Sequence, residues 1–317
     1  MNNTASITIL MATYNGEQYL VDQIESIINQ TYTNWLLIIR DDHSTDTTVN
    51  IINKYTTTYK NIIQIENIGS SPGSVSNFGA LYTWAKNNLK LNYLMFCDQD
   101  DIWLFNKIEI SLENLLNKEK VYKNLPLLIY TDLELISESG KKLNIRINVL
   151  PEITFNQIIA QNYCFGCTMM LNKELIGIID EIPAFAENHD YWIALVAIGF
   201  GHAIYLNEPV ILYRQHNNNV SSQGNSLKKR IKRYSKGLNM QINSLGMRLI
   251  MLNYYYKVYN NQLSTNKKEM LIKYVTAYNE GFMTVLKSAI KYKIWRLNFL
   301  QNIGFLFIIV RYLWRRQ

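Results

Sequence analysis

The first hundred residues alternate short apolar runs with segments of helical period, and this alternation restricts the fold more than any other feature of the chain. Between the runs, apolar residues recur at helical spacing, as Leu20, Ile24 and Ile27 do. The runs have the length and composition of buried strands: "SITILMAT" (6–13), "WLLIIRDD" (35–42), "NIIQIEN" (61–67) and "NYLMFC" (92–97). This order predicts an α/β fold with a mostly parallel central sheet flanked by helices.

The second half of the chain continues the sheet and then changes in character. Its strand candidates are "LLIYTD" (127–132), "GCTMML" (166–171) and "PVILYR" (209–214), and "HDYWIALVAIGF" (189–200) is a candidate helix. From Ser226 the sequence is basic, rich in Tyr and helical in pattern. We therefore predict a catalytic domain over residues 1–225, followed by a helical appendage over residues 226–317.

Charge is divided unevenly between these two parts. Residues 1–225 carry 14 Lys and Arg against 23 Asp and Glu, whereas residues 226–317 carry 18 against 2. The basic part interleaves its cations with Trp, Tyr, Phe and Ile. That composition is typical of segments at an anionic membrane surface, although a solvated helical face, a nucleic-acid surface or an oligomerisation element would also be basic. We expect a membrane partner, no nucleic acid, and self-association as the alternative.

The expected location follows from what the sequence lacks. No run of 18 or more apolar residues is present, and no signal peptide precedes the first strand-like run. Three cysteines are too few for a disulfide framework, and Cys164 and Cys167 have no second pair with which to bind zinc, so we expect them to be packing residues. These features predict a cytoplasmic protein, peripheral at the inner face of the cell membrane.

Polar and acidic residues follow three of the predicted strands. Thr13 and Tyr14 follow the first, Asp41 and Asp42 end the second, and "DQDD" (98–101) follows the fourth. Parallel strands bring their carboxyl ends to one edge, where α/β proteins bind ligands. On an extended strand, Asp98 and Asp100 would face the same way and suit Mg²⁺ or Mn²⁺. An isolated D-x-D is more often a solvated turn, but this placement favours a metal site.

An ordered set of motifs gives the chain a family resemblance. The motifs are "ITILMATYNGEQYL", "IIRDDHSTDTT", "NIGSSPGSVSNFG", "MFCDQDDIW", "NYCFGCTMMLNKEL", "HDYW" and "YRQHNNN". In this order, over residues 6 to about 220, the chain resembles the family 2 glycosyltransferases of the GT-A fold, particularly the rhamnosyltransferase-like members that build surface polysaccharides. The resemblance implies an inverting transfer from a nucleotide-diphosphate sugar to a glycan or lipid-linked acceptor, with Mn²⁺ or Mg²⁺ as cofactor.

The resemblance also implies roles for individual residues. Asp190, in "HDYW", would be the general base, and His189 stands where the family usually has Glu. The residues implied to bind the nucleotide sugar are Thr13, Tyr14, Asn15, Asp42, Asn77, Asp98 and Gln99. Those implied to hold the metal are Asp98, Asp100 and His216. The Q-x-x-R-W motif of processive synthases is absent from the sequence, so we expect a single transfer per encounter.

Several alternatives remain open from the residues alone. "DQDDIW" and "HDYW" favour dTDP-L-rhamnose, but relatives use UDP-hexoses and UDP-N-acetylhexosamines. A sugar nucleotidyltransferase shares the same metal and nucleotide chemistry, although "ATYNGEQYL" (12–20) lacks the basic residues that would hold a triphosphate. Asp41 can cap the turn that follows it. We expect Asp101 to shape the metal loop or to cap the helix that begins near Asn106, and not to be a metal ligand. We expect His189 to be a packing or surface residue.

Overall fold

Four strands in the N-terminal half pair in parallel, as the alternation predicts. They are β1 (Ile7–Thr13), β2 (Trp35–Asp41), β3 (Ile62–Ile65) and β4 (Tyr93–Cys97). β1 lies between β2 and β4, with Thr13 beside Asp41 and Met11 beside Cys97. The carboxyl ends of these three strands therefore meet at one edge of the sheet, as the sequence predicted.

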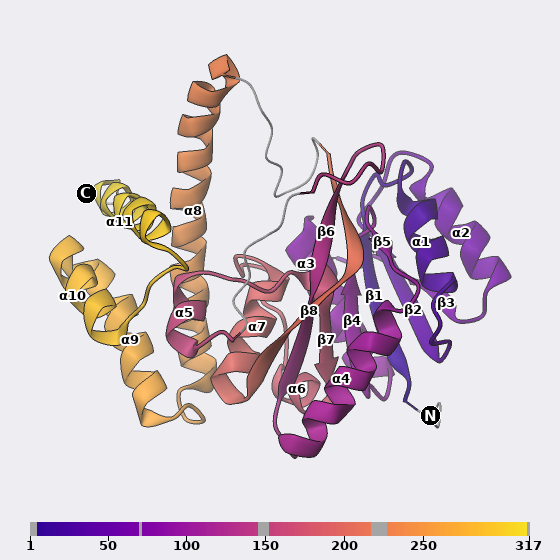
Figure 1. Ribbon diagram of the computed structural model, residues 1–317, viewed down its shortest axis with the longest axis horizontal. Coiled ribbons are helices and arrows are strands. Elements are labelled where there is room, and N and C mark those ends of the chain that lie inside the picture. The colour runs from indigo at the N-terminus through magenta and orange to yellow at the C-terminus, as the bar shows by residue number, and fades with distance from the viewer. Residues whose placement is uncertain (1–4, 70–71, 145–151, 217–226, 316–317) are drawn as a thin grey trace.

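The rest of the sheet is mixed in direction. The computed structural model, which describes residues 5–69, 72–144, 152–216 and 227–315 (side chains of 227–236 excepted), has one sheet of eight strands in the order β3-β2-β1-β4-β7-β6-β8-β5 (Figure 1). β7 runs antiparallel to β4 and to β6, β8 runs parallel to β6, and β5 runs antiparallel to β8. Their bounds are β5 (Ile102–Trp103), β6 (Leu127–Ser137), β7 (Met169–Asn172) and β8 (His202–Gln215).

Helices cover both faces of the sheet because successive strand residues point to opposite sides. In β1, Ile7, Ile9 and Met11 enter one core and Leu10 enters the other. The first core is covered by α1 (Leu20–Ile28), α2 (Thr48–Thr58) and α4 (Lys107–Val121). The second is covered by α3 (Ser74–Asn88), α5 (Phe155–Ala160), α6 (Lys173–Ile178) and α7 (His189–Phe200).

The C-terminal segment is helical, as predicted, and it packs on the second face. It consists of α8 (Leu227–Tyr259), α9 (Thr265–Glu280), α10 (Phe282–Tyr292) and α11 (Phe299–Trp314) (Figure 1). Trp192 of α7 makes ring contacts with Tyr255 and Tyr259 of α8, all three buried. The segment thus shares one apolar core with the sheet. The predicted boundary near residue 225 lies outside the described residues.

Polar contacts tie this segment to both ends of α7. Arg248 of α8 pairs with Glu187, just before α7, at 2.8 Å, and both side chains are almost fully buried. At the other end, Lys267 of α9 donates to the carbonyls of Ile198 and Gly199, at 3.0 and 2.8 Å. A cation at a helix C-terminus is favourable because carbonyl groups there lack intrahelical partners. The α7 helix is therefore held at both ends.

In the described part of the chain, no helix is both long enough and apolar enough to cross a bilayer.

Candidate active site at the carboxyl ends of β1, β2 and β4

The ends of β1 and β2 are joined by a side-chain network around Asp41. Asp41 is buried and accepts hydrogen bonds from the Thr13 hydroxyl at 2.9 Å and from the Ser44 backbone and hydroxyl at 2.7 and 2.6 Å. Asp41 therefore caps the turn after β2, the alternative left open by the sequence. Thr13, predicted to line the nucleotide, is itself buried and orients this carboxylate.

The loop after β1 is fixed against the loop after β4 by one side-chain amide. Gln99 accepts a hydrogen bond from the Tyr14 backbone N–H at 2.8 Å and donates one to the Tyr14 carbonyl at 2.9 Å. Asn15, at φ 46°, accepts from the Thr45 N–H at 2.8 Å. The Tyr14 ring is more than half exposed, so its face is open at this edge. The structure thus brings together three of the predicted nucleotide residues, Tyr14, Asn15 and Gln99.

Asp42 and Asn77 belong to a second network centred on Arg40. Asp42 accepts from the Gly73 N–H at 2.7 Å and from Asn67 at 3.2 Å. Asn77, also buried, accepts from Arg40 at 2.8 Å and donates to its carbonyl at 3.1 Å. Asn77 is therefore placed beneath the edge, where it holds Arg40, and its predicted contact with the donor sugar nucleotide stays a prediction.

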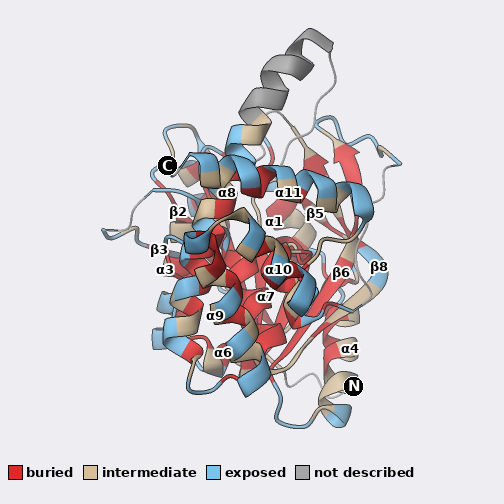
Figure 2. Cartoon of the chain, turned by 90° about the vertical axis from the view of Figure 1, so that its left-hand side faces the viewer, coloured by how far each residue is buried: buried red, intermediate tan, exposed pale blue. Residues whose placement is uncertain are grey.

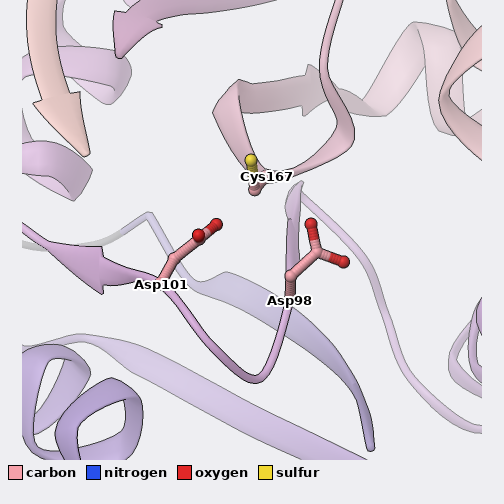
Figure 3. A group of neighbouring side chains, drawn as sticks. All are labelled: Asp98, Asp101 and Cys167. Atoms are coloured by element: carbon pink, nitrogen blue, oxygen red, sulfur yellow. The ribbon is translucent and has the colours of Figure 1, made fainter. Parts of the chain in front are cut away.

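The "DQDD" segment is a turn, and the expectation that Asp98 and Asp100 lie on an extended strand was wrong. β4 ends at Cys97, and the chain bends from Asp98 to Asp101 before β5 begins at Ile102. Pairing of β1 with β4 stops at Cys97, which frees the next four residues to turn. Figure 3 shows the Asp101 carboxylate directed toward Cys167, with Asp98 across from it. The three ligand atoms lie within 4.8 Å of one another.

The predicted metal residues Asp100 and His216 are in direct contact. The Asp100 carboxylate lies 2.7 Å from His216 Nε2, and the His216 ring stacks on Tyr19 with centroids 5.0 Å apart. His216 directly follows β8. Its contact with Asp100 therefore joins two predicted ligands that are 116 positions apart in the sequence. Asp98, the third predicted ligand, groups instead with Asp101 and Cys167.

Asp101 holds this turn from its buried side and does not cap a helix. Its side chain is fully buried and accepts from the Arg214 backbone N–H at 3.1 Å. The Arg214 guanidinium donates to the Asp100 carbonyl at 3.0 Å and pairs with Asp22 at 3.1 Å. α4 begins after Asn106 without a side-chain cap. The loop-shaping role predicted for Asp101 is therefore confirmed, and the capping role is wrong.

The residues at this edge suit a divalent cation. Burial, together with the charges of Asp100 and Asp190, raises the pKa of Asp98 to about 7, so an added positive charge would be strongly favourable there. One oxygen of the buried Asp101 has no hydrogen-bond partner among the described residues. Carboxylates are ligands that Mg²⁺ and Mn²⁺ accept, whereas the thiol of Cys167 is a soft ligand that these ions do not favour. The acids of the turn therefore fit a divalent cation of this kind.

Asp190 occupies the first turn of α7 and is held by two donors. Asn162 donates to one carboxylate oxygen at 3.0 Å and the Gly166 N–H donates to the other at 3.1 Å. Burial nonetheless raises the pKa of Asp190 to about 7, against the effect of both hydrogen bonds. A carboxylate with this pKa can accept a proton near neutral pH. Asp190 is thus a buried carboxyl group, held by two donors, whose pKa lies near neutral pH, and its role as the general base stays a prediction.

His189, next to the proposed base, packs beneath it. Its ring lies 4.0 Å from Phe78 and 5.3 Å from Phe96, centroid to centroid, and burial lowers its pKa to about 3. A Cβ at Gly166 would lie 2.4 Å from His189 Nε2, so only glycine fits there. The packing role predicted for His189 is confirmed. All three cysteines are buried and free, and Cys164 and Cys167 pack in the two apolar cores, as expected.

Three residues near the site were not predicted from the sequence: Arg214 and Asn162, which donate hydrogen bonds to its carboxyl groups, and the buried Lys107, which interacts electrostatically with Asp101. Arg214 had a signal, because it lies inside the quoted "YRQHNNN" motif. Asn162 also begins a quoted motif, but only folding places it against Asp190. Lys107 is fully buried with its Nζ 4.7 Å from the centre of the Trp103 ring, and burial lowers its pKa to about 8. Nothing in the sequence pattern distinguished it from a surface lysine.

Solved structures share this architecture. Residues covering 90% of the chain superpose on 80% of Staphylococcus aureus TarS 1–349, solved with UDP-GlcNAc, at a TM-score of 0.56 and 13% identity. The mannosyltransferase PcManGT of Pyrobaculum calidifontis, solved with GDP-Man and Mn²⁺, matches 99% of the chain over 89% of its own length, at a TM-score of 0.51 and 12% identity. At these identities the likeness shows a shared fold, the GT-A fold expected from the sequence.

Sequence comparisons establish the family. The chain is 30% identical over 233 residues to the dTDP-rhamnosyl transferase RfbG of Shigella flexneri, covering 70% of this chain and 77% of that one. It is 28% identical over 219 residues to the putative teichuronic acid biosynthesis glycosyltransferase TuaG of Bacillus subtilis, covering 68% and 81%. The model of glycosyl transferase family 2 matches residues 8–172, more than half of the chain. The chain therefore belongs to glycosyltransferase family 2.

Proposed function

We propose that the chain is an inverting glycosyltransferase that moves a sugar from a nucleotide-diphosphate sugar to a glycan or lipid-linked acceptor during surface polysaccharide biosynthesis. One observation carries the proposal. Asp190, poised near neutral pH, acts electrostatically on Asp98 of the "DQDD" turn. The two carboxyl groups are thus close enough to interact, and Asp98 directly follows β4 at the edge where α/β proteins bind ligands; this supports Asp190 as proton acceptor beside a donor-binding acid.

In the proposed reaction, Asp190 accepts the proton of the acceptor hydroxyl. A sugar hydroxyl is a weak nucleophile, and removal of its proton during attack is worth roughly 10²–10⁴-fold in rate. Asn162 and the Gly166 N–H orient the carboxylate. Because a single base acts on the face opposite the leaving diphosphate, attack inverts the configuration at the anomeric carbon.

The donor would bind across the edge formed by β1, β2 and β4. We assign the nucleotide to the Tyr14 face and to Asp42, with Gln99 holding the Tyr14 backbone in place. Asp98, Asp100 and His216 would hold Mn²⁺ or Mg²⁺. When bound, the ion offsets the negative charge that develops on the departing diphosphate. The PcManGT complex with Mn²⁺ supports this cofactor class for the fold.

dTDP-L-rhamnose is the donor we favour, with UDP-hexoses and UDP-N-acetylhexosamines as the alternatives. The likeness to a dTDP-rhamnosyl transferase over 70% of the chain supports the first donor. We further propose that the enzyme works at the inner face of the cell membrane, where a lipid-linked acceptor would be presented. The basic C-terminal segment supports that location.

A donor panel tests the proposal. The purified chain is incubated with dTDP-rhamnose, UDP-glucose, UDP-N-acetylglucosamine and GDP-mannose, each with Mn²⁺ or Mg²⁺, and release of the nucleoside diphosphate is measured. We expect one donor to be turned over well above the others and excess chelator to stop the reaction. Release of pyrophosphate from a sugar phosphate and a nucleoside triphosphate would show a nucleotidyltransferase instead. Turnover of no sugar nucleotide would contradict the proposal.

A further inference from the structure

α11 has an apolar surface on both sides. Its inner residues Phe305, Ile308 and Ile309 are buried in the core. The residues on its outer side are large, apolar and 43% to 78% exposed: Phe299, Leu300, Ile303, Phe307, Val310 and Trp314. At 100° per residue these six fall within an arc of about 100° of the helix surface, which we call the outer stripe. A helix that is hydrophobic all round is normally buried or at a membrane.

Cations border the outer stripe. Arg311 and Arg315 are exposed and follow the stripe in the helical projection. The Arg311 guanidinium lies 5.8 Å from the Phe307 ring and 5.5 Å from the Trp314 ring, measured to the centroids. Basic residues beside exposed aromatic and aliphatic side chains are typical of helices that lie in the membrane interface.

The neighbouring helix α10 presents a similar face on the same side of the molecule. Met283, Lys287, Ile290 and Lys291 recur at helical spacing and are all exposed. α10 and α11 are in contact, and Figure 2 shows exposed residues of both helices turned toward the viewer. The two contacting helices thus both expose apolar side chains with cations beside them.

We propose that this surface, the outer stripe of α11 with the exposed face of α10, docks on an anionic lipid bilayer with α11 lying in the plane of the interface. Anionic headgroups complement the charge, because residues 226–317 carry 18 Lys and Arg against 2 Asp and Glu. A second copy of the chain would place the same cations opposite one another, which is unfavourable. This proposal adds to the proposed function the surface that binds the membrane. It rests on that function only for the reason why the protein would bind a membrane.

Vesicle binding tests the proposal without any substrate. The full chain is mixed at low salt with vesicles of phosphatidylcholine alone or with one third phosphatidylglycerol, and the bound fraction is measured by sedimentation. We expect binding to the anionic vesicles that weakens with salt. The double variant Leu300→Glu, Phe307→Glu should reduce the partition coefficient tenfold or more. Val121→Glu, at a 70% exposed position on α4, is the matched control and should bind as the wild type does.

A second readout reports on α11 itself. Trp314 is 67% exposed, so quenching of tryptophan fluorescence by brominated lipids should fall in Trp314→Phe relative to the wild type. Equal vesicle binding by the stripe variant, or no binding by the wild type at low salt, would overturn the proposal. So would a dimer in sedimentation velocity that Leu300→Glu dissociates while vesicles are ignored. Nucleoside diphosphate release, measured separately, shows whether the proposed enzymatic function has failed independently.

Discussion

At the scale of single residues, the site depends on carboxyl groups whose protonation is set by opposing effects. Burial favours the neutral form of Asp190, whereas Asn162 and the Gly166 N–H favour the charged form, and the pKa settles at about 7. A base with this pKa is ionised above pH 7 and protonated below it. Turnover should therefore rise with pH up to about 7 and level off above it.

Removing Asn162 should move this pH dependence. Asn162→Ala deletes a hydrogen bond to the charged form of Asp190, so the pKa of Asp190 should rise. The acidic limb of kcat against pH should then shift by about one unit to higher pH, since a hydrogen bond to a charged group is worth at least about 1.4 kcal/mol. Asn156→Ala, which removes an exposed hydrogen bond to the Lys293 carbonyl, is the control. A limb that stays in place or moves to lower pH would contradict the role of Asn162.

Asp100→Ala tests the predicted metal residues. This change should abolish transfer while leaving the fold intact, because it removes one acid from a crowded anionic turn and relieves repulsion there. Donor turnover and the melting temperature are the two measurements. Asp180→Ala, at a highly exposed carboxylate, should retain full activity. If Asp100→Ala is fully active, or if the wild type works in excess chelator, the metal hypothesis is wrong.

At the scale of elements, the last residues of β8 hold the "DQDD" turn in place. The Arg214 backbone N–H donates a hydrogen bond to the Asp101 carboxylate, and its guanidinium group donates to the backbone carbonyls of Asp100 and Glu138. The contacts with Asp101 and Asp100 join residues 113 and 114 positions apart in the sequence, and the contact with Glu138 joins residues 76 positions apart. The turn is thus positioned by the far side of the sheet rather than by its own strand.

Arg214→Lys should loosen that turn. Lysine keeps the charge but cannot reproduce the planar fork of donors, so we expect weaker donor binding and a loss of about 1–3 kcal/mol in the free energy of unfolding. Donor affinity by calorimetry and stability by urea titration provide the measurements. Arg311→Lys, on the exposed side of α11, should change neither. Unchanged donor affinity in Arg214→Lys would show that Arg214 does not position the turn.

The elements of the first hundred residues could be predicted from sequence because their apolar periods are strong. β1 to β4 and the helices between them follow directly from runs such as "ITILM" and from Leu20, Ile24 and Ile27. The turn at Asp98 was not predictable, because the apolar run shows where a strand lies but not that its pairing with β1 stops at Cys97. The grouping of Asp98 with Asp101 and Cys167 also needed the fold, since β7 brings Cys167 to the edge from 66 residues beyond Asp101.

At the scale of the whole molecule, the C-terminal helices and the sheet form one packed unit. Local periodicity predicts that residues 226–317 are helical, but the contacts of Tyr255 with Trp192 are non-local and needed the structure. The same packing ties the basic segment to the proposed base, because Glu187, three residues before Asp190, is held by Arg248. Changes in the segment can therefore reach the site.

Breaking the buried pair tests that connection. Arg248→Met leaves the Glu187 charge buried without its partner, which should cost about 3–5 kcal/mol in the free energy of unfolding. Adding Glu187→Gln should recover part of this loss, because it removes the uncompensated charge. Lys291→Met, which breaks the exposed pair with Glu269, should have little measurable effect. Equal urea midpoints for Arg248→Met and Lys291→Met would contradict the coupling of α8 to the body.

The role proposed for Asp190 as the general base of a sugar transfer is tested by the turnover of Asp190→Asn at saturating donor, measured together with donor affinity. Asparagine keeps the shape of the side chain but cannot take up the proton. We expect turnover to fall by about 10²-fold or more while the dissociation constant of the donor changes little. Loss of donor binding, with normal turnover of the donor that is still bound, would show that Asp190 is a binding residue and that the claim is wrong.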